Sequence, residues 1–224
     1  MNVSDFLRQY GGELAREFAV HLQLMGWSLG LALLLSAPLA VAMLRWQVLV
    51  PPVLAVVSIM QTVPSIALLG FLLPWLGIGT KPAVAALVLY ALLPLVRNSY
   101  VGLSGTDPLV VDAARGMGMS WGQILRQVRL PLALPVVFAG IRTAAVINVG
   151  VTTLSALVGA GGLGVFIFRG IATNNTAVIL LGALPAALLA VTIDGLLAWM
   201  QQLLLRRRRH GLLVAAGLVL FLSA

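Results

Sequence analysis

The sequence predicts an all-α integral membrane protein, a polytopic helical bundle with five core transmembrane helices and a partial sixth apolar segment. Three observations lead to this fold class. The 224 residues are 61% hydrophobic and only 9% charged, whereas a soluble domain carries about 25% charged residues. Apolar runs recur at the length of about 20 residues that a helix needs to cross a bilayer. A polar stretch with three arginines, residues 112–131, stands between such runs.

Composition also excludes several classes of function. The absence of cysteine excludes a disulfide framework, a cysteine metal site and a thiol nucleophile. The net charge of +8 includes Arg206–Arg209 directly after an apolar run, where the positive-inside rule accounts for them. Basic residues interleaved with aromatics on a soluble face, the pattern of a nucleic-acid partner, are not seen. No nucleophile–base pair or metal-ligand cluster suggests an enzyme.

The N-terminal part predicts an external segment followed by a first span. Residues 1–17 are mixed polar and charged with apolar residues at near-helical spacing, which indicates an external amphipathic helix and no cleaved signal peptide. The first span is expected at about residues 18–44, ending at Arg45. His21, near its start, is interpreted as an interfacial histidine because no second ligand lies at metal spacing.

Residues 46–80 carry no charge and are too long for one simple span. Because Arg45 and the basic region 97–142 should both be cytoplasmic, an even number of crossings must lie between them. We therefore expect one broken span within 48–76, interrupted by Pro51-Pro52, Pro64 and Pro74. An external turn at 77–82 and a return span at about 82–100 should follow.

The stretch 107–131 predicts short helices joined by turns. Asp107-Pro108 supplies an N-cap and a first helical residue, and Gly116 and Gly118 allow the chain to leave the helix. Ser120 and Gln123 match a capping box, and Leu130-Pro131 is expected to end that second helix, with Pro131 able to open the next one. The predicted product is a compact elbow on the membrane surface, a shape suited to docking a partner.

A helix from about residue 132 to 158 should re-enter the membrane and lead to a glycine run. Because glycine destabilises a helix interior by about 1 kcal/mol relative to alanine, this run predicts a tight external turn or a short re-entrant piece. Its candidate gate or turn residues are Gly159, Gly161, Gly162 and Gly164. The run lacks the Gly-Lys-Ser/Thr of a phosphate loop, so any ATP must be handled by another subunit.

The last core span is expected at about residues 177–205, stopped by Arg206–Arg209. The topology then has the N-terminus outside, five crossings and the arginine cluster in the cytoplasm. The predicted parts are the external segment 1–17, the membrane domain 18–205, and a basic stop with an apolar tail at 206–224. The apolar tail is marginal for spanning alone. It is either a hydrophobic tail on the membrane or the start of a sixth span leading to an external domain.

Polar residues inside the spans have two interpretations. They either line a pathway, for which the candidates are Gln61, Thr62, Asn148 and Thr152, or make hydrogen bonds between helices, the interpretation we prefer. Asp194 is interpreted as the only acid inside a span. We expect it toward the cytoplasmic end of the last span in a structural pair, although attraction of a quaternary ammonium or a proton relay are alternatives.

The elbow resembles the "EAA" signature of permeases of ABC importers, which has Glu-Ala-Ala, a spaced Gly and Ile-x-Leu-Pro. Asp stands here for Glu and Val for Ile. The matching residues are Asp112, Ala113, Ala114, Gly118, Val128, Leu130 and Pro131. The resemblance implies a type I ABC permease domain, with this segment as the coupling helix that sits in a cleft of a cytoplasmic ATPase.

Further segments resemble the permeases of osmoprotectant importers for glycine betaine, choline, carnitine and proline betaine. They are residues 61–68, 77–79, 90–100, 139–144 and 159–164. The resemblance implies a bacterial-type plasma (inner) membrane and partners outside this chain. These are a second permease copy or paralogue, an ABC ATPase dimer that uses ATP with Mg, and an external substrate-binding protein or fused domain. The chain itself is then a transport subunit that binds no cofactor and no metal.

Rival functions remain open. One is an ABC permease for another small solute such as an amino acid. Another is a secondary transporter or channel without ATP, although such proteins often show inverted repeats or several intramembrane charges, and neither is evident. A membrane-anchored scaffold would not need so long a polytopic core.

Overall fold

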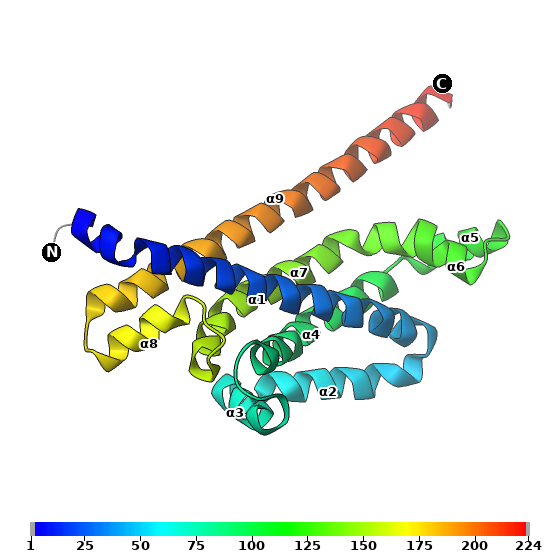
Figure 1. Ribbon diagram of the computed structural model, residues 1–224. Coiled ribbons are helices and arrows are strands. Elements are labelled where there is room, and N and C mark those ends of the chain that lie inside the picture. The colour runs from blue at the N-terminus through cyan, green and yellow to red at the C-terminus, as the bar shows by residue number, and fades with distance from the viewer. Residues whose placement is uncertain (1–2, 223–224) are drawn as a thin grey trace.

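The computed structural model describes the backbone of residues 3–222 and the side chains of residues 10–203. Every regular element in this part of the chain is helical. The α-helices are α1 (Val3–Arg45), α2 (Val50–Thr62), α3 (Ser65–Leu76), α4 (Thr80–Ser104), α5 (Pro108–Gly116), α6 (Trp121–Gln123), α7 (Leu130–Thr152), α8 (Gly164–Ala172) and α9 (Thr176–Leu222). Three irregular helical segments lie between them: a 3-10 turn Gln47–Leu49, a π-helical turn Ile124–Arg129 and a 3-10 turn Thr153–Val158. The long helices form an elongated bundle with α5 and α6 at one end and α8 at the other (Figure 1).

The apolar helices confirm the predicted all-α membrane fold. Within the described residues, four helical stretches are long and apolar enough to cross a membrane: Tyr10–Arg45, Thr80–Ser104, Trp121–Val158 and Thr176–Leu203. A fifth crossing is reached when the pair Gln47–Thr62 and Ser65–Leu76, bent by 100°, counts as one span. The expected boundary at residue 17 is not marked by any break, because α1 is continuous from Val3 to Arg45.

The bent pair α2 and α3, which lies where a broken span was expected, is interrupted at one place. Pro51 and Pro52 lie in the first turn of α2, where a missing N–H costs no hydrogen bond, and Pro74 lies inside α3. The break falls at Val63-Pro64, where Val63 is extended. The Tyr90 hydroxyl of α4 donates a hydrogen bond to the Val63 carbonyl, so the backbone group freed by the bend is satisfied across the bundle.

Helix α4 is the centre of the bundle, packed chiefly against α1 and α7. Its alanines and leucines, among them Ala83, Leu87 and Leu95, are buried. The approach of α7 is so close that a Cβ on Gly140 would lie 2.8 Å from the Pro94 carbonyl oxygen and 2.7 Å from the Asn98 Cβ. Small residues at such crossings permit the close backbone packing that holds membrane helices together.

The predicted end of the elbow helix is only partly correct. Pro131 lies in the first turn of α7, as expected, but Leu130-Pro131 does not interrupt the helical chain, because the π-helical turn leads directly into α7, with the Leu130 N–H donating to the Leu125 carbonyl. This wider turn leaves room before the Pro131 ring, which would crowd a normal α-turn. The backbone of α9 stays helical through Arg206–Arg209 to Leu222, and the expectation that this cluster stops the last membrane span stays a prediction. The side chains of the arginine cluster and of the apolar tail lie outside the described residues.

Candidate functional site

The elbow at residues 107–131 is built by local hydrogen bonds, as its sequence predicts. The Leu109 N–H donates to Asp107 Oδ1 at 2.9 Å and caps α5. Gly118 has φ +79°, and the Met119 N–H donates to the Ala114 carbonyl at 3.1 Å, which closes the end of α5. The Ser120 capping box is complete: the Ser120 N–H donates to Gln123 Oε1 at 2.7 Å, and the Gln123 N–H donates to Ser120 Oγ at 3.4 Å.

A small hydrophobic core holds the two arms of the elbow together. Val111 and Ala114 of α5 pack with Ile124 of the π-helical turn, and all three are buried. Met119 and Val128 complete this cluster. Of the predicted coupling residues, Ala114 and Val128 therefore stabilise the inside of the elbow. Asp112, Ala113, Gly118, Leu130 and Pro131 are exposed.

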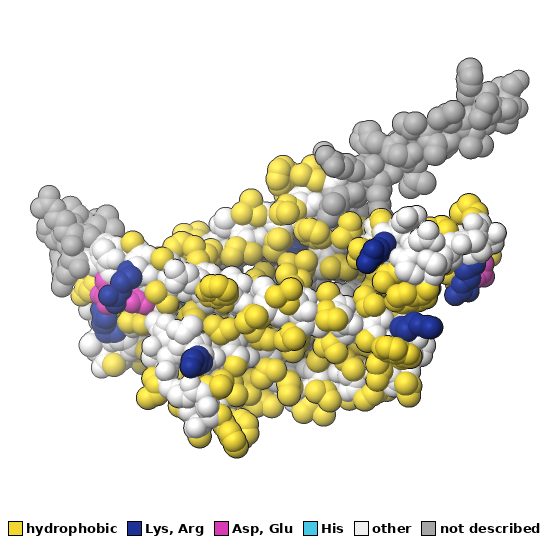
Figure 2. Space-filling view, turned by 45° about the vertical axis from the view of Figure 1, so that its right-hand side comes forward, with side chains coloured by type: hydrophobic (Ala, Val, Ile, Leu, Met, Phe, Trp, Pro, Cys, Tyr) yellow, Lys and Arg dark blue, Asp and Glu magenta, His cyan; other side chains and the backbone are white. Residues whose placement is uncertain are grey.

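The outer face of α5 carries exposed apolar side chains. Leu109 and Met117 are 77% and 75% exposed, and Ala113 lies between them at helical spacing on the same face. Beside them, Arg115 Nη1 and Asp112 Oδ1 form an exposed ion pair at 3.0 Å. On the face drawn in Figure 2, most charged side chains gather toward the two ends of the bundle and hydrophobic side chains cover the middle. An apolar surface at the charged end of a membrane bundle is suited to contact another protein.

The elbow is fastened to the bundle at two points. Arg129 Nη1 donates to the Leu103 carbonyl at the end of α4, at 2.8 Å. The Arg45 guanidinium, at the end of α1, lies 5.9 Å from the centre of the Trp121 ring. Since the π-helical turn also continues into α7, a force on the elbow would reach α1, α4 and α7.

The glycine run at the other end of the bundle is held by side chains of α1. The Gly162 N–H donates to Glu17 Oε2 at 2.8 Å, and the Leu163 N–H donates to His21 Nδ1 at 3.3 Å. Ser155 Oγ donates to the Gly161 carbonyl at 2.9 Å. Gly159, Gly161 and Gly162 all have positive φ. The candidate turn residues thus form a tight turn, exposed at Gly159 and buried at Gly162 and Gly164, and α8 starts at Gly164.

This arrangement corrects two interpretations from the sequence. His21 is not an interfacial histidine, because it is fully buried. Asp194 is not the only acid inside a span, because Glu17 lies within the apolar stretch Tyr10–Arg45 and is 5% exposed. Both side chains are buried because they accept backbone N–H groups of the glycine turn. Their partners lie 145 and 142 residues away, so no local pattern could reveal them.

Helix α8 is tied to α1 by a bidentate ion pair. Arg169 Nη1 and Nη2 donate to Glu13 Oε2 and Oε1 at 2.9 and 2.5 Å. The hydrogen bond to Glu13 raises the pKa of the Arg169 guanidinium above its usual value, against a smaller opposing effect of burial. The ring of Tyr10 also meets that of Phe166 edge to face, with 6.3 Å between centroids.

The four candidate pathway residues are not brought together. Gln61 and Thr62 lie at the end of α2 beside the bend, whereas Asn148 and Thr152 are fully buried on α7. Asn148 Nδ2 donates to Ser28 Oγ of α1 at 2.9 Å, and Thr152 Oγ1 donates to the Asn148 carbonyl at 2.6 Å. The Asn148–Ser28 hydrogen bond joins α7 to α1, as expected for helix packing, whereas the Thr152 hydroxyl bonds within α7. A pathway role for Gln61 and Thr62 stays a prediction.

Asp194 is paired with Arg142, as the structural interpretation expects. Arg142 Nη2 donates to Asp194 Oδ2 at 2.6 Å, and Arg142 Nε donates to Asp194 Oδ1. The two side chains come from α7 and α9, within apolar stretches of both helices. A pair in such a position neutralises two charges that are costly in hydrocarbon when alone.

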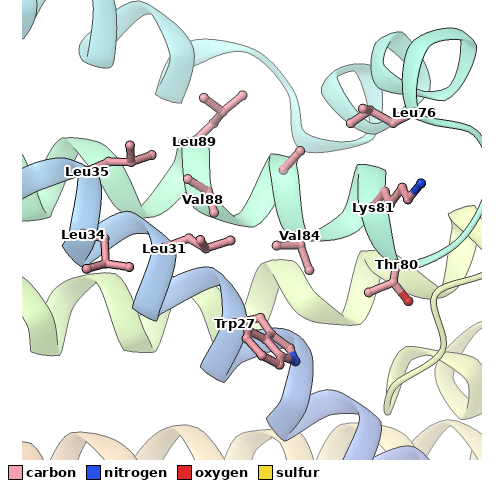
Figure 3. A pocket seen from close by; sticks show the side chains of 11 residues that line it. Trp27, Leu31, Leu34, Leu35, Leu76, Thr80, Lys81, Val84, Val88 and Leu89 are labelled. Atoms are coloured by element: carbon pink, nitrogen blue, oxygen red, sulfur yellow. The ribbon is translucent and has the colours of Figure 1, made fainter.

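An apolar groove of about 740 Å³ lies along α1 and α4. Figure 3 shows Leu31, Leu34 and Leu35 of α1 facing Val84, Val88 and Leu89 of α4, with Lys81 and Thr80 toward one end. Polar groups are confined to that end, so the groove is unsuited to a small charged solute. Among the described residues, no group of three or more His, Asp or Glu side chains is placed to hold a metal ion.

Comparison with known proteins gives consistent results. Residues 32–210 match the family model described as binding-protein-dependent transport system inner membrane component. The osmoprotectant import permease protein OsmW of Salmonella typhimurium is 42% identical, over 91% of this chain and 97% of its own length. The permease proteins OpuCD and OpuCB of the glycine betaine/carnitine/choline transport system of Bacillus subtilis are 38% and 39% identical. The two alignments cover 95% and 86% of this chain and 94% and 89% of the relatives.

Solved structures share the fold. An inward-facing form of the MetNI methionine ABC transporter matches with a TM-score of 0.78 at 24% identity, over 85% of this chain and 95% of that one. An amino acid ABC transporter crystallised with histidines matches with a TM-score of 0.74 at 15% identity, over 90% and 98% of the two chains.

Proposed function

Since the chain belongs to the family of binding-protein-dependent transport system inner membrane components, we propose that it is the permease subunit of an ATP-driven importer for small quaternary-ammonium osmoprotectants. One observation carries the substrate class: relatives named for osmoprotectant, glycine betaine, carnitine and choline transport match the chain at 38% to 42% identity over most of both lengths. The bundle supplies the membrane pathway, and ATP with Mg is bound by a separate ATPase subunit.

The elbow is the docking element for that ATPase. Leu109, Ala113 and Met117 form its contact face, and their exposure in the isolated chain supports a protein partner. Gly118 lets α5 end sharply, with no heavy atom within 4 Å of where its Cβ would lie, so a partner surface can approach closely. Asp112, already paired with Arg115, offers a carboxylate to a basic group of the partner.

Movement of the ATPase is transmitted through the fastening points of the elbow. Its small core of Val111, Ala114 and Ile124 makes it a stiff lever. The lever pulls α4 through the Arg129–Leu103 hydrogen bond and α7 through the continuous π-helical turn. When ATP closes the ATPase dimer, two such levers approach each other and turn the permease outward.

The assembly therefore contains two permeases with two elbows on the cytoplasmic side. The second permease is another copy of this chain or a paralogue. The two Bacillus subtilis relatives are different permease proteins named for one transport system, which supports a paralogue as the second permease. The N-terminus and the glycine turn lie on the outer side, where a binding protein or fused domain delivers substrate and Glu17 keeps the turn rigid.

The decisive experiment measures uptake and ATPase attachment together. The chain, its ATPase and its binding protein are reconstituted in proteoliposomes, and uptake of labelled glycine betaine is followed with ATP on the ATPase side. In parallel, the amount of ATPase that co-purifies with the permease is quantified. The test variant is Met117→Asp on the outer face of α5. The matched control is Ile78→Asp. Ile78 is also an exposed apolar residue, 83% exposed, and it lies in the expected external turn at residues 77–82.

We expect ATP-dependent uptake by the wild type. Met117→Asp should lose ATP-dependent uptake, and its affinity for the ATPase should fall at least about tenfold, as for a residue at the centre of an interface. Ile78→Asp should retain the ATPase. Uptake without ATP would overturn the importer assignment. Uptake of an amino acid instead of glycine betaine would leave the importer in place and replace the substrate class. Full ATPase attachment in Met117→Asp would remove the elbow from the interface.

A further inference from the structure

A polar groove of about 410 Å³ lies between the elbow and the ends of α1 and α4. Three arginines line it from three different elements: Arg45 of α1, Arg115 of α5 and Arg129 of the π-helical turn. Gln47 and Ser104 add neutral polar groups, and no aspartate or glutamate lines it. Three positive charges converge on one concave surface without an acid among them, which is the chemistry of an anion site.

Existing contacts hold the three arginines in place, but these contacts do not occupy all of their hydrogen-bond donors. Arg129 is held by one hydrogen bond to the Leu103 carbonyl at 2.8 Å, and Arg45 lies against the face of the Trp121 ring. Arg115 makes an exposed pair with Asp112, which is outside the lining of the groove. Because a guanidinium has five N–H donors, each arginine keeps donors for a further acceptor. Held in this way, the three side chains lose little additional freedom on binding an anion.

The position of the groove selects the kind of anion. Arg45 is the last residue of the apolar stretch Tyr10–Arg45, and Ser104 is the last of Thr80–Ser104. Trp46 and Trp121 are 58% and 42% exposed beside these ends, and exposed tryptophans mark the interface between hydrocarbon and water. The groove therefore opens at headgroup depth. Basic pockets between helices on the cytoplasmic side of membrane proteins bind anionic headgroups.

We propose that this groove binds the phosphodiester headgroup of an anionic phospholipid. The inference rests on the proposed function in one respect, the cytoplasmic side of the elbow. A bound headgroup bridges Arg45 of the membrane bundle to Arg115 of the elbow, so it stiffens the joint through which the elbow moves α1 and α4. Anionic lipid then acts as a structural part of the coupling device, and its removal loosens the elbow.

The test measures lipid binding without ATP or transport. The purified full-length chain, in nanodiscs of phosphatidylcholine with increasing phosphatidylglycerol, is analysed by native mass spectrometry for the ratio of bound anionic to zwitterionic lipid. The test variants are Arg45→Gln and Arg45→Gln/Arg115→Gln. The matched control is Arg126→Gln, an exposed arginine of the same elbow that does not line the groove. Because each groove arginine would donate charge-assisted hydrogen bonds to the headgroup, which Arg126 does not reach, each groove substitution should reduce the preference about tenfold.

A decrease in the two groove variants with no decrease in Arg126→Gln supports the site. An equal decrease in all three variants, or in none, overturns it. Displacement of the lipid by millimolar inorganic phosphate would make it a small-anion site. Displacement on adding the ATPase would assign the groove to acidic side chains of that partner, and either displacement overturns the lipid proposal. Because no outcome depends on ATP or uptake, failure here is separate from failure of the proposed function.

Discussion

The two ends of this bundle are stabilised in opposite ways (Figure 1). The elbow, residues 107–131, is held mostly by contacts between near neighbours: the Asp107 cap, the Ser120 capping box and a five-residue core. The glycine turn, residues 159–164, is held by Glu17 and His21 of α1, more than 140 residues earlier in the chain. The elbow is stabilised by contacts within itself, whereas the glycine turn depends on side chains of a helix far away in the sequence.

This difference fits two different tasks. An element that must swing as one body needs stiffness inside itself and few attachments outside, which describes the elbow. An element that must stay in place while helices around it tilt needs attachments across the bundle, which describes the glycine turn. Low local stability is confined to parts with few buried contacts, so the elbow should open or shift before the turn does.

The largest effect is expected for Gly164→Ala. A Cβ there would lie 1.7 Å from the Thr153 carbonyl oxygen, so the backbone of the turn would have to move, and a loss above about 4 kcal/mol would mark such a clash. At the elbow, Gly118→Ala meets no atom within 4 Å and faces only its φ of +79°, which costs about 1 kcal/mol. Thermal unfolding of both purified variants gives the comparison. Similar melting temperatures for the two would contradict a packed turn and an open elbow.

A smaller loss is expected for Glu17→Leu. The Gly162 N–H would lose its acceptor while buried, at a cost of about 1–3 kcal/mol. Glu17→Gln is the matched control, because its amide oxygen still accepts this hydrogen bond. Hydrogen exchange of the glycine turn and the melting temperature should therefore change in Glu17→Leu and much less in Glu17→Gln. Equal destabilisation by both would show that the charge of Glu17, and not the hydrogen bond, holds the turn.

The same contrast explains what the sequence could predict. The caps at Asp107 and Ser120 and the open glycine at 118 were predictable because donor and acceptor are within a few residues of each other. The roles of Glu17 and His21 were not predictable, because their partners are brought near only by the fold. A histidine near the start of an apolar run has the same local sequence whether it is interfacial or buried.

The positions of prolines and of charged residues predicted the helix breaks and ion pairs only in part. Pro64 breaks the second span and Pro131 does not break the helix that contains it, since a π-helical turn before Pro131 absorbs its ring. Local sequence does not distinguish these outcomes, which depend on what packs against each turn. Asp194 was expected in a structural pair, and the pair exists. Its partner Arg142 is 52 residues away, and only the packing of α7 against α9 identifies it.

A local effect of about 1 kcal/mol is expected for Ser120→Ala. The substitution removes the acceptor of the Gln123 N–H and with it half of the capping box. Because the elbow has its own small core, amide exchange should quicken in residues 117–125 while the melting temperature of the bundle changes little. Ser120→Thr keeps the hydroxyl and serves as control. A drop in global melting temperature as large as that of Glu17→Leu would mean that the elbow unfolds together with the bundle.

The smallest effect on stability is expected for Asp112→Asn. Its ion pair with Arg115 is exposed on both sides, and such pairs contribute only about 0.2–0.5 kcal/mol. The melting temperature should thus be unchanged within error. Substrate-stimulated ATP hydrolysis is the more informative measurement, because in the proposed interface the carboxylate of Asp112 meets a basic group of the ATPase. A loss of substrate-stimulated ATP hydrolysis with unchanged stability would separate the docking role of Asp112 from any role in folding the elbow. Asp112→Glu keeps the carboxylate and is the control: a loss in Asp112→Asn alone assigns the effect to the negative charge, and equal losses in both variants would contradict this role.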